Sequence, residues 1–133
     1  MASTIQFTAT NGKKISILVE QIQRARVTLS SEDDHGARSR VDWTQMSLVK
    51  ESIEEVSAAI KASLPSFMYL SAGDGKAIWF DAKKAIGPFE LLPSQRSDKV
   101  QCSIKIMGYR QTVAQAPDEV RRLMRENGGT PLP

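Results

Sequence analysis

Apolar and polar residues alternate along several short segments of the chain, which is the pattern of half-buried β-strands. Residues 5–9 and 15–19 both follow this pattern. Asn11-Gly12 lies between them, and because both residues tolerate a positive φ, the pair predicts a tight hairpin. Further segments expected to form strands lie at residues 24–29, 40–48, 67–71, 77–80, 89–92, 100–106 and 110–113.

Two other segments have apolar residues at helical spacing. The first, residues 53–64, follows Ser52, which forms a capping box with Glu55 three positions later, and a proline ends it. The second starts at Pro117, a residue suited to the first helical position, and ends before Gly128-Gly129. Each helix has one apolar side, so each needs a sheet to cover.

Landmarks of the first half of the chain recur in the second half at a nearly constant distance. Asn11-Gly12-Lys13 lies between the first two strands, and Asp74-Gly75-Lys76 lies between two later strands, 63 positions further on. Glu54-Glu55-Val56 lies at the start of the first helix, and Asp118-Glu119-Val120 lies at the start of the second, 64 positions further on. Matches in one order at one offset indicate an internal repeat.

We therefore predict an α+β protein built from two tandem β-β-β-β-α repeats, whose antiparallel sheets are covered by the two helices. The first repeat spans residues 1–64, the second spans 65–129, and residues 130–133 are expected to form a loose tail. A unit of about 64 residues is marginally stable alone. We therefore expect the two repeats to share one compact domain, related by a pseudo-twofold axis.

Composition and charge place few limits on function. The chain has 133 residues, of which 41% are hydrophobic and 25% charged, as in ordinary globular proteins. The net charge is +3, and the excess lies in residues 65–133, where there are ten Lys and Arg residues but seven Asp and Glu residues. This balance indicates a solvated surface, with an anionic partner as the alternative.

The single cysteine, Cys102, excludes an internal disulfide and favours a reducing compartment. The first residues lack the apolar core of a signal peptide. No apolar run approaches the roughly 18 residues that a membrane helix needs. We expect a soluble cytoplasmic protein without a membrane partner.

Three aromatic residues distinguish the second repeat from the first. Phe67, Tyr69 and Trp79 occupy positions on the outward face of the second hairpin where the first repeat has polar residues. The rings are expected either to pack between the repeats or at a dimer contact, or to form an exposed surface that binds a protein partner. Aromatic residues on a sheet near Lys and Arg also bind single-stranded nucleic acid, which is a third interpretation.

Four arginines lie on two neighbouring predicted strands. Arg24 and Arg26 project from one strand, and Arg38 and Arg40 project from the next. If these strands pair, the four guanidinium groups share one face, where they could bind an anion or nucleic acid. The alternative is that they protect a sheet edge and keep it soluble, with Asp42 neutralising part of the charge.

Candidate catalytic and metal-binding residues are few. His35, the single histidine, lies in a polar loop, and Cys102 has the inward phase of a strand. Glu32-Asp33-Asp34 lacks the ligand spacing of a calcium loop, and zinc sites need several Cys or His residues. Gly73-Asp74-Gly75-Lys76 is followed by Ala77 rather than Ser or Thr, so we interpret it as a hairpin turn rather than a phosphate-binding loop. We expect no enzymatic activity, no cofactor and no metal.

The segments 11–15 (Asn-Gly-Lys-Lys-Ile), 19–22 (Val-Glu-Gln-Ile) and 50–56 (Lys-Glu-Ser-Ile-Glu-Glu-Val) resemble the small FlbD-type proteins of flagellar operons and of bacterial and phage genomes. Residues 74–76 and 116–120 match the same pattern more loosely, so the chain resembles a tandem duplication of that unit. The resemblance implies a small bacterial or phage accessory protein with no defined catalytic residues. The topology of two such repeats is also similar to the PUR-alpha and Whirly proteins, which bind single-stranded nucleic acid.

Together these patterns predict a non-enzymatic interaction module that acts through protein contacts and forms a dimer. One alternative is a single-stranded nucleic-acid-binding protein that uses the aromatic residues and the arginines. Another is a protein that sequesters a small ligand in a pocket between the repeats.

Overall fold

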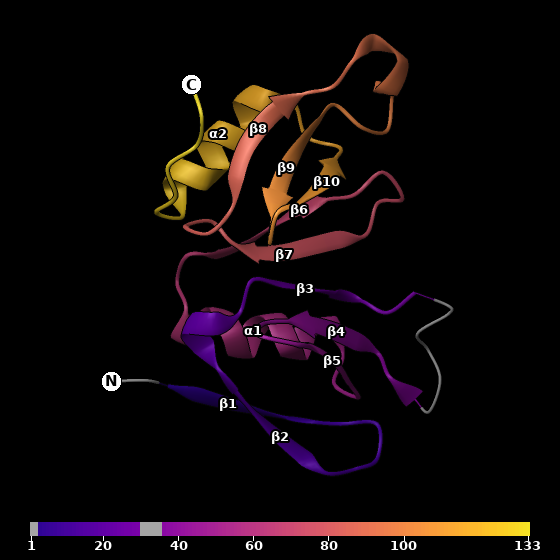
Figure 1. Ribbon diagram of the computed structural model, residues 1–133, viewed down its shortest axis with the longest axis vertical. Helices are drawn as coiled ribbons and strands as arrows, with labels where there is room; N and C mark the ends of the chain where they lie inside the picture. The colour runs from indigo at the N-terminus through magenta and orange to yellow at the C-terminus, as the bar shows by residue number, and fades with distance from the viewer. Residues whose placement is uncertain (1–2, 30–35) are drawn as a thin grey trace.

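The computed structural model of the chain describes residues 3–29 and 36–133. Within these residues the protein is α+β, with ten strands and two α-helices, and all its strand pairs are antiparallel. The first half lies in the lower part of Figure 1 and the second half in the upper part.

Each half contains a hairpin, then three further strands, then a helix. The first half consists of β1 (Thr4–Thr8), β2 (Lys14–Leu18), β3 (Arg24–Val27), β4 (Ser39–Asp42), β5 (Met46–Val49) and α1 (Ile53–Ser63). The second half consists of β6 (Phe67–Ser71), β7 (Ala77–Asp81), β8 (Ile86–Glu90), β9 (Cys102–Ile106), β10 (Tyr109–Val113) and α2 (Pro117–Glu126).

Five strands therefore precede each helix, where the predicted β-β-β-β-α repeat has four. In the first half the difference arises at residues 43–45, where the chain reverses and Trp43 N–H donates to Gln45 O at 3.0 Å. The segment expected to be one strand thus forms two, and β4 pairs with β5.

The halves are joined by β3 and β7, which pair with each other in the middle of the molecule (Figure 1). This pairing creates a five-stranded sheet in the order β5-β4-β3-β7-β6, beside the three-stranded sheet β10-β9-β8 and the hairpin β1-β2. A twofold axis would pair equivalent strands. Because β3 is the third strand of its half and β7 is the second of its own, the expected pseudo-twofold is absent at this junction.

The five-stranded sheet separates two hydrophobic cores. One core lies between the hairpin β1–β2, helix α1 and one face of the sheet, and it includes Phe7, Val41 and Ile60. The other lies between β6–β7, the three-stranded sheet and α2, and it includes Phe80 and Ile104. Adjacent residues of β6 belong to different cores, because successive side chains of a strand point to opposite faces.

Local signals in the sequence explain the ends of the helices. The Ser52 hydroxyl accepts from Glu55 N–H at 3.2 Å, as the capping box predicts. Helix α2 begins at Pro117, and Gly128 follows its end with a φ of 83°, a conformation that favours glycine. Residues 130–133 do not form the expected loose tail, because Leu132 N–H donates to Gly87 O of β8 at 2.7 Å.

The hairpin turns of the two halves have the same hydrogen bonds. Lys13 N–H donates to the Asn11 side chain at 2.9 Å, and 63 positions later Lys76 N–H donates to the Asp74 side chain at 3.0 Å. Gly12 and Gly75 have φ values of 84° and 83°. Residues 73–76 are thus a hairpin turn, as predicted.

Candidate binding surface

The three aromatic residues singled out from the sequence lie at the junction of the two halves. Phe67 is completely buried and stacks on Trp79, with ring centroids 5.5 Å apart. Tyr69 also contacts Trp79, with ring centroids 4.9 Å apart, and is 53% exposed. Phe67 and Trp79 pack into the core beneath α1. This arrangement is the expected packing between repeats, and it leaves Tyr69 as the most exposed of the three rings.

The arginines singled out from the sequence lie on paired strands. Residues directly opposite each other point to the same face of a sheet. Arg26 of β3 lies opposite Arg40 of β4, and Arg24 lies opposite Asp42. Arg38 immediately precedes β4, where its carbonyl accepts from Thr28 N–H at 3.3 Å, and it is exposed.

One buried carboxylate fixes two of these arginines. Asp42 is 2% exposed, and its two oxygens accept from Arg24 Nε at 2.8 Å and from Arg40 Nε at 2.9 Å. Charge-assisted hydrogen bonds of this length hold guanidinium groups in defined positions. Two cations on one anion leave the three residues with a net positive charge.

Among the described residues, the arginines lie on a part of a sheet face where the side chains are partly exposed. Arg24 lies opposite Phe80 of β7, so this face continues into the core of the second half. The three-stranded sheet lies over β6–β7, whereas Met46 on β5 is 50% exposed. We call this open part of the face the shelf; its residues are Arg24, Arg26, Arg40, Asp42, Met46 and Leu48.

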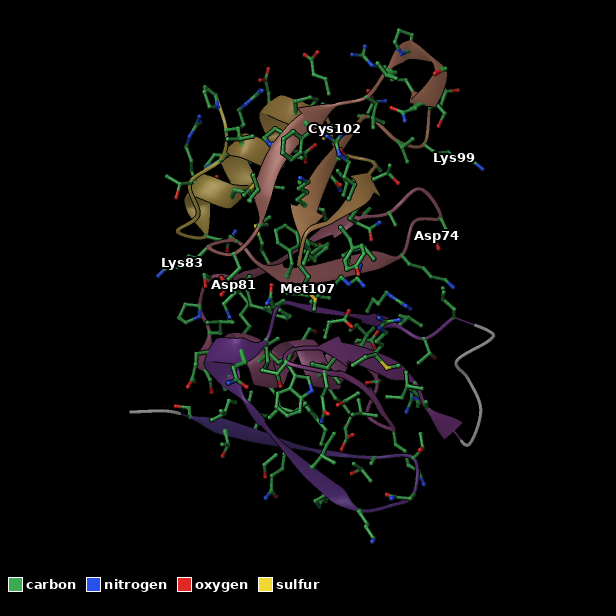
Figure 2. The ribbon with its side chains drawn as sticks, in the orientation of Figure 1. Asp74, Asp81, Lys83, Lys99, Cys102 and Met107 are labelled. Atoms are coloured by element: carbon green, nitrogen blue, oxygen red, sulfur yellow. The ribbon has the colours of Figure 1, made fainter. Side chains whose placement is uncertain are left out.

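Strand β10 forms a wall beside the shelf. Gln111 Oε1 accepts from Arg24 Nη1 at 3.5 Å, and Tyr109, on the same side of β10, is 74% exposed. Met107 and Gly108 form the turn between β9 and β10, with φ values of 57° and 80°. Figure 2 shows Met107 at the boundary between the two halves.

A groove of about 310 Å³ continues the shelf at the place where β3 and β7 separate. The last pair between these strands is Arg26 with Ile78, and beyond it the strands diverge. The groove is lined by cationic, anionic and apolar side chains, including Arg24, Arg26, Leu29, Asp74, Lys76 and Ile78. It lies between the two halves, where a pocket was expected for a ligand-sequestering protein.

The buried Cys102 has the properties of a structural thiol. Burial raises its pKa to about 11, so the thiol is protonated at neutral pH. Its Sγ donates to Gln115 O at 3.3 Å. At the equivalent position of the first half, 63 residues earlier, the hydroxyl of Ser39 donates to Glu51 O at 2.7 Å.

Possible metal ligands do not gather elsewhere in the part of the chain that the structure describes, where no three His, Cys, Asp or Glu residues form a cluster. The acidic segment 32–34 and His35 lie outside the described residues. Among residues 3–29 and 36–133, no helix is long and apolar enough to span a membrane.

The sequence predicted the shared face of the arginines, but it predicted neither the contact with β10 nor the residues that line the groove. Alternation placed Arg24, Arg26 and Arg40 on one face, whereas Gln111 and Leu29 join the site through the pairing of β3 with β7. No local pattern signals that pairing. In comparisons with known proteins, no family model matches the chain, and no curated protein or solved structure is significantly similar to it.

Proposed function

We propose that this protein is a non-enzymatic binding module that holds an extended acidic and apolar segment of a protein partner on the shelf and in the groove. The observation that supports this proposal best is the position of the Asp42-anchored arginines directly beside exposed apolar side chains. Met46, on the shelf, is 50% exposed, and Leu29, in the groove, is 49% exposed.

The chemistry of the shelf suits carboxylates. A guanidinium group donates in a planar fork that matches a carboxylate, and Asp42 holds Arg24 and Arg40 before any ligand arrives. Binding then costs less side-chain entropy than it would with freely rotating arginines. Lys76 adds a further cation at the groove.

The exposed apolar side chains of Met46 and Leu29 suit a partner that has apolar as well as acidic residues. Methionine is flexible and polarisable, and it adapts to varied partner surfaces. An extended strand of the partner that alternates acidic and apolar residues presents each kind to one side. The shelf and the adjoining groove therefore complement such a segment better than either would complement a purely acidic one.

Single-stranded nucleic acid is the second candidate, because the exposed Tyr109 lies on β10 two residues from Gln111, which accepts from Arg24. Bases stack on exposed rings while cations contact phosphates. The candidate is weaker because Phe67 is buried and Trp79 packs beneath α1, which removes two of the three rings expected to stack. A small ligand is the third candidate, and the groove volume lies near the lower limit for such sites.

We further propose that the chain arose by duplication of one unit of the FlbD-type pattern. Equivalent hydrogen bonds support this proposal, because the same turn and the same contact before the helix occur in both halves. The two copies then differ where Phe67 and Trp79 replace polar residues, and these rings join the halves.

Fluorescence anisotropy with two labelled probes tests the proposed function. One probe is a peptide of alternating glutamate and leucine, and the other is an oligo-dT strand. Met46→Asp and Arg24→Ala are expected to weaken peptide binding about tenfold each, which corresponds to about 1.4 kcal/mol. The matched controls Leu92→Asp and Arg122→Ala lie on exposed positions away from the shelf and are expected to leave binding unchanged.

Each outcome of this experiment decides between the candidates. Stronger binding of oligo-dT than of the peptide, with a steep loss at high salt, would establish the nucleic-acid alternative. Failure of both probes to bind would overturn the proposal.

A further inference from the structure

The outer edge of β2 has no partner strand among the described residues. Val19 N–H bonds to Ser3 O at 2.9 Å, and Ala9 N–H bonds to Lys13 O at 2.8 Å, so odd-numbered residues bond across the hairpin. In an antiparallel pair the alternate residues direct their N–H and C=O groups the other way. The backbone groups of Lys14, Ser16 and Leu18 therefore face outward, and among the described strands β2 pairs with β1 alone.

In the second half, the strand edge equivalent to the outer edge of β2 is paired. Strand β7 is the second strand of its hairpin, as β2 is of the first, and the outer edge of β7 pairs with β3. The counterpart of β3 in the second half is β8. Its edge is closed, because Leu132 N–H donates to Gly87 O at 2.7 Å and Pro88 has no N–H. Strand β2 therefore cannot pair with β8 of another copy in the way that β7 pairs with β3.

We infer that β2 pairs with β2 of a second copy, antiparallel about a twofold axis at Ser16. The pairing joins two hairpins into one four-stranded sheet, and a closed twofold is the commonest symmetry of homo-oligomers. Ser16 then lies opposite Ser16 of the second copy. Ile15 lies opposite Ile17, and Lys14 lies opposite Leu18, so no like charges face each other.

The side chains of β2 favour this pairing, because they do not protect the strand edge against it. Exposed edge strands are commonly protected by an outward lysine, a proline or a bulge. Lys14 does not serve this purpose, because its Nζ donates to the Thr8 hydroxyl at 2.9 Å, across the hairpin towards β1. Ile15 is only partly buried, and the second copy would cover it.

Dimerisation through β2 leaves the shelf accessible. The hairpin β1–β2 lies at the lower end of the molecule in Figure 1, whereas the shelf and groove adjoin the β3–β7 junction. A dimer of this kind presents two shelves, so it would bind a partner with repeated segments more tightly than a monomer would. The inference itself does not depend on the nature of that partner.

A charge exchange at Ser16 tests the inference, with mass measured by light scattering during gel filtration. The wild type is expected to have the mass of two chains. Ser16→Lys and Ser16→Glu are each expected to have the mass of one chain, because the twofold places like charges opposite each other. An equimolar mixture of the two variants is expected to regain the mass of two chains.

The control is Gln6→Lys, an exposed position directly opposite Ser16 on the other strand of the same hairpin. It introduces the same side chain without touching the β2 edge, and it is expected to keep the mass of two chains. Circular dichroism establishes that each variant is folded. A monomeric wild type, a dimer that Ser16→Lys leaves intact, or a mixture that stays monomeric would each overturn the inference.

Discussion

The Glu51 carboxylate accepts hydrogen bonds from both the backbone N–H of Thr8, at 2.8 Å, and the Thr8 hydroxyl, at 2.9 Å. These bonds tie the end of β1 to the segment that precedes α1. In the second half Gln115 Oε1 accepts from Ser71 N–H at 3.0 Å, at the equivalent positions. Each half therefore attaches its first strand to the start of its helix through one side chain.

The contact of Glu51 with Thr8 predicts a pH-dependent contribution to stability. Burial alone raises the pKa of Glu51, but the hydrogen bonds from Thr8 and the charge of Lys14 outweigh it, so the pKa lies below the ordinary value of 4.5. A folded-state pKa below the unfolded one means that the stabilisation is present above about pH 4.5 and is lost as the pH falls through the folded pKa.

Glu51→Gln is therefore expected to reduce the loss of stability between neutral and acidic pH, and Glu51→Ala to cost about 1 kcal/mol at neutral pH. Urea denaturation of both variants across that pH range measures these effects. Asp98→Asn, at an exposed loop position, serves as the control. An unchanged pH profile for Glu51→Gln would contradict the role of the carboxylate.

The matching contacts of Cys102 and Ser39 predict that Cys102→Ser is tolerated. The first half already uses a hydroxyl at this position, where it donates to Glu51 O at 2.7 Å. Ser39→Ala removes that donor and leaves a carbonyl without it, at an expected cost of about 1–2 kcal/mol. Urea denaturation compares the two variants; equal destabilisation by both would show that the positions are not equivalent.

The native thiol of Cys102 is also expected to react slowly with a thiol reagent, since burial keeps it protonated.

The stacked rings at the junction predict a large loss of stability for one substitution and a small loss for another on the same strand. Phe67→Ala removes a completely buried ring, and we expect it to cost about 3–5 kcal/mol. Tyr69→Ala removes a half-exposed ring whose contact with Trp79 contributes about 1 kcal/mol. Thermal denaturation separates the two effects. Similar small losses for both variants would show that the rings do not hold the halves together.

Local chemistry in the sequence predicted those features of the fold that depend on a few adjacent residues. The Asn11-Gly12 turn and the Ser52 cap are present because each is decided by its own side chains and backbone. The strand count of the first half was wrong because the reversal at residues 43–45 contains no glycine, proline, asparagine or aspartate to signal it.

The pairing of β3 with β7, unlike the turn and the cap, does not depend on a few adjacent residues. It brings together residues more than 50 positions apart, such as Ala25 and Trp79, and no short pattern encodes it. The arginine face could be predicted because alternation within two strands decides it. The wall at Gln111 and the groove could not, since both exist only after the halves have joined.

The attachment of the C-terminal residues predicts the effect of removing them. Leu132 N–H bonds to Gly87 O, and Arg121 Nε donates to Leu132 O at 3.0 Å. Deletion of residues 130–133 removes these bonds, and we expect a loss of about 1 kcal/mol in the free energy of unfolding. The deletion is expected to leave the mass at two chains, because Pro88 still has no N–H to offer an incoming strand.

Urea denaturation and light scattering of the truncated protein measure both effects, and the same truncation in the Ser16→Lys background is the control. Assemblies larger than two chains would contradict the role assigned to Pro88. They would indicate that residues 130–133, and not Pro88, prevent another strand from pairing with the edge of β8. The freed edge of β8 would then pair with β2 of another copy, as β3 pairs with β7 within one chain. Such head-to-tail contacts do not close on themselves, so the assemblies would grow with protein concentration.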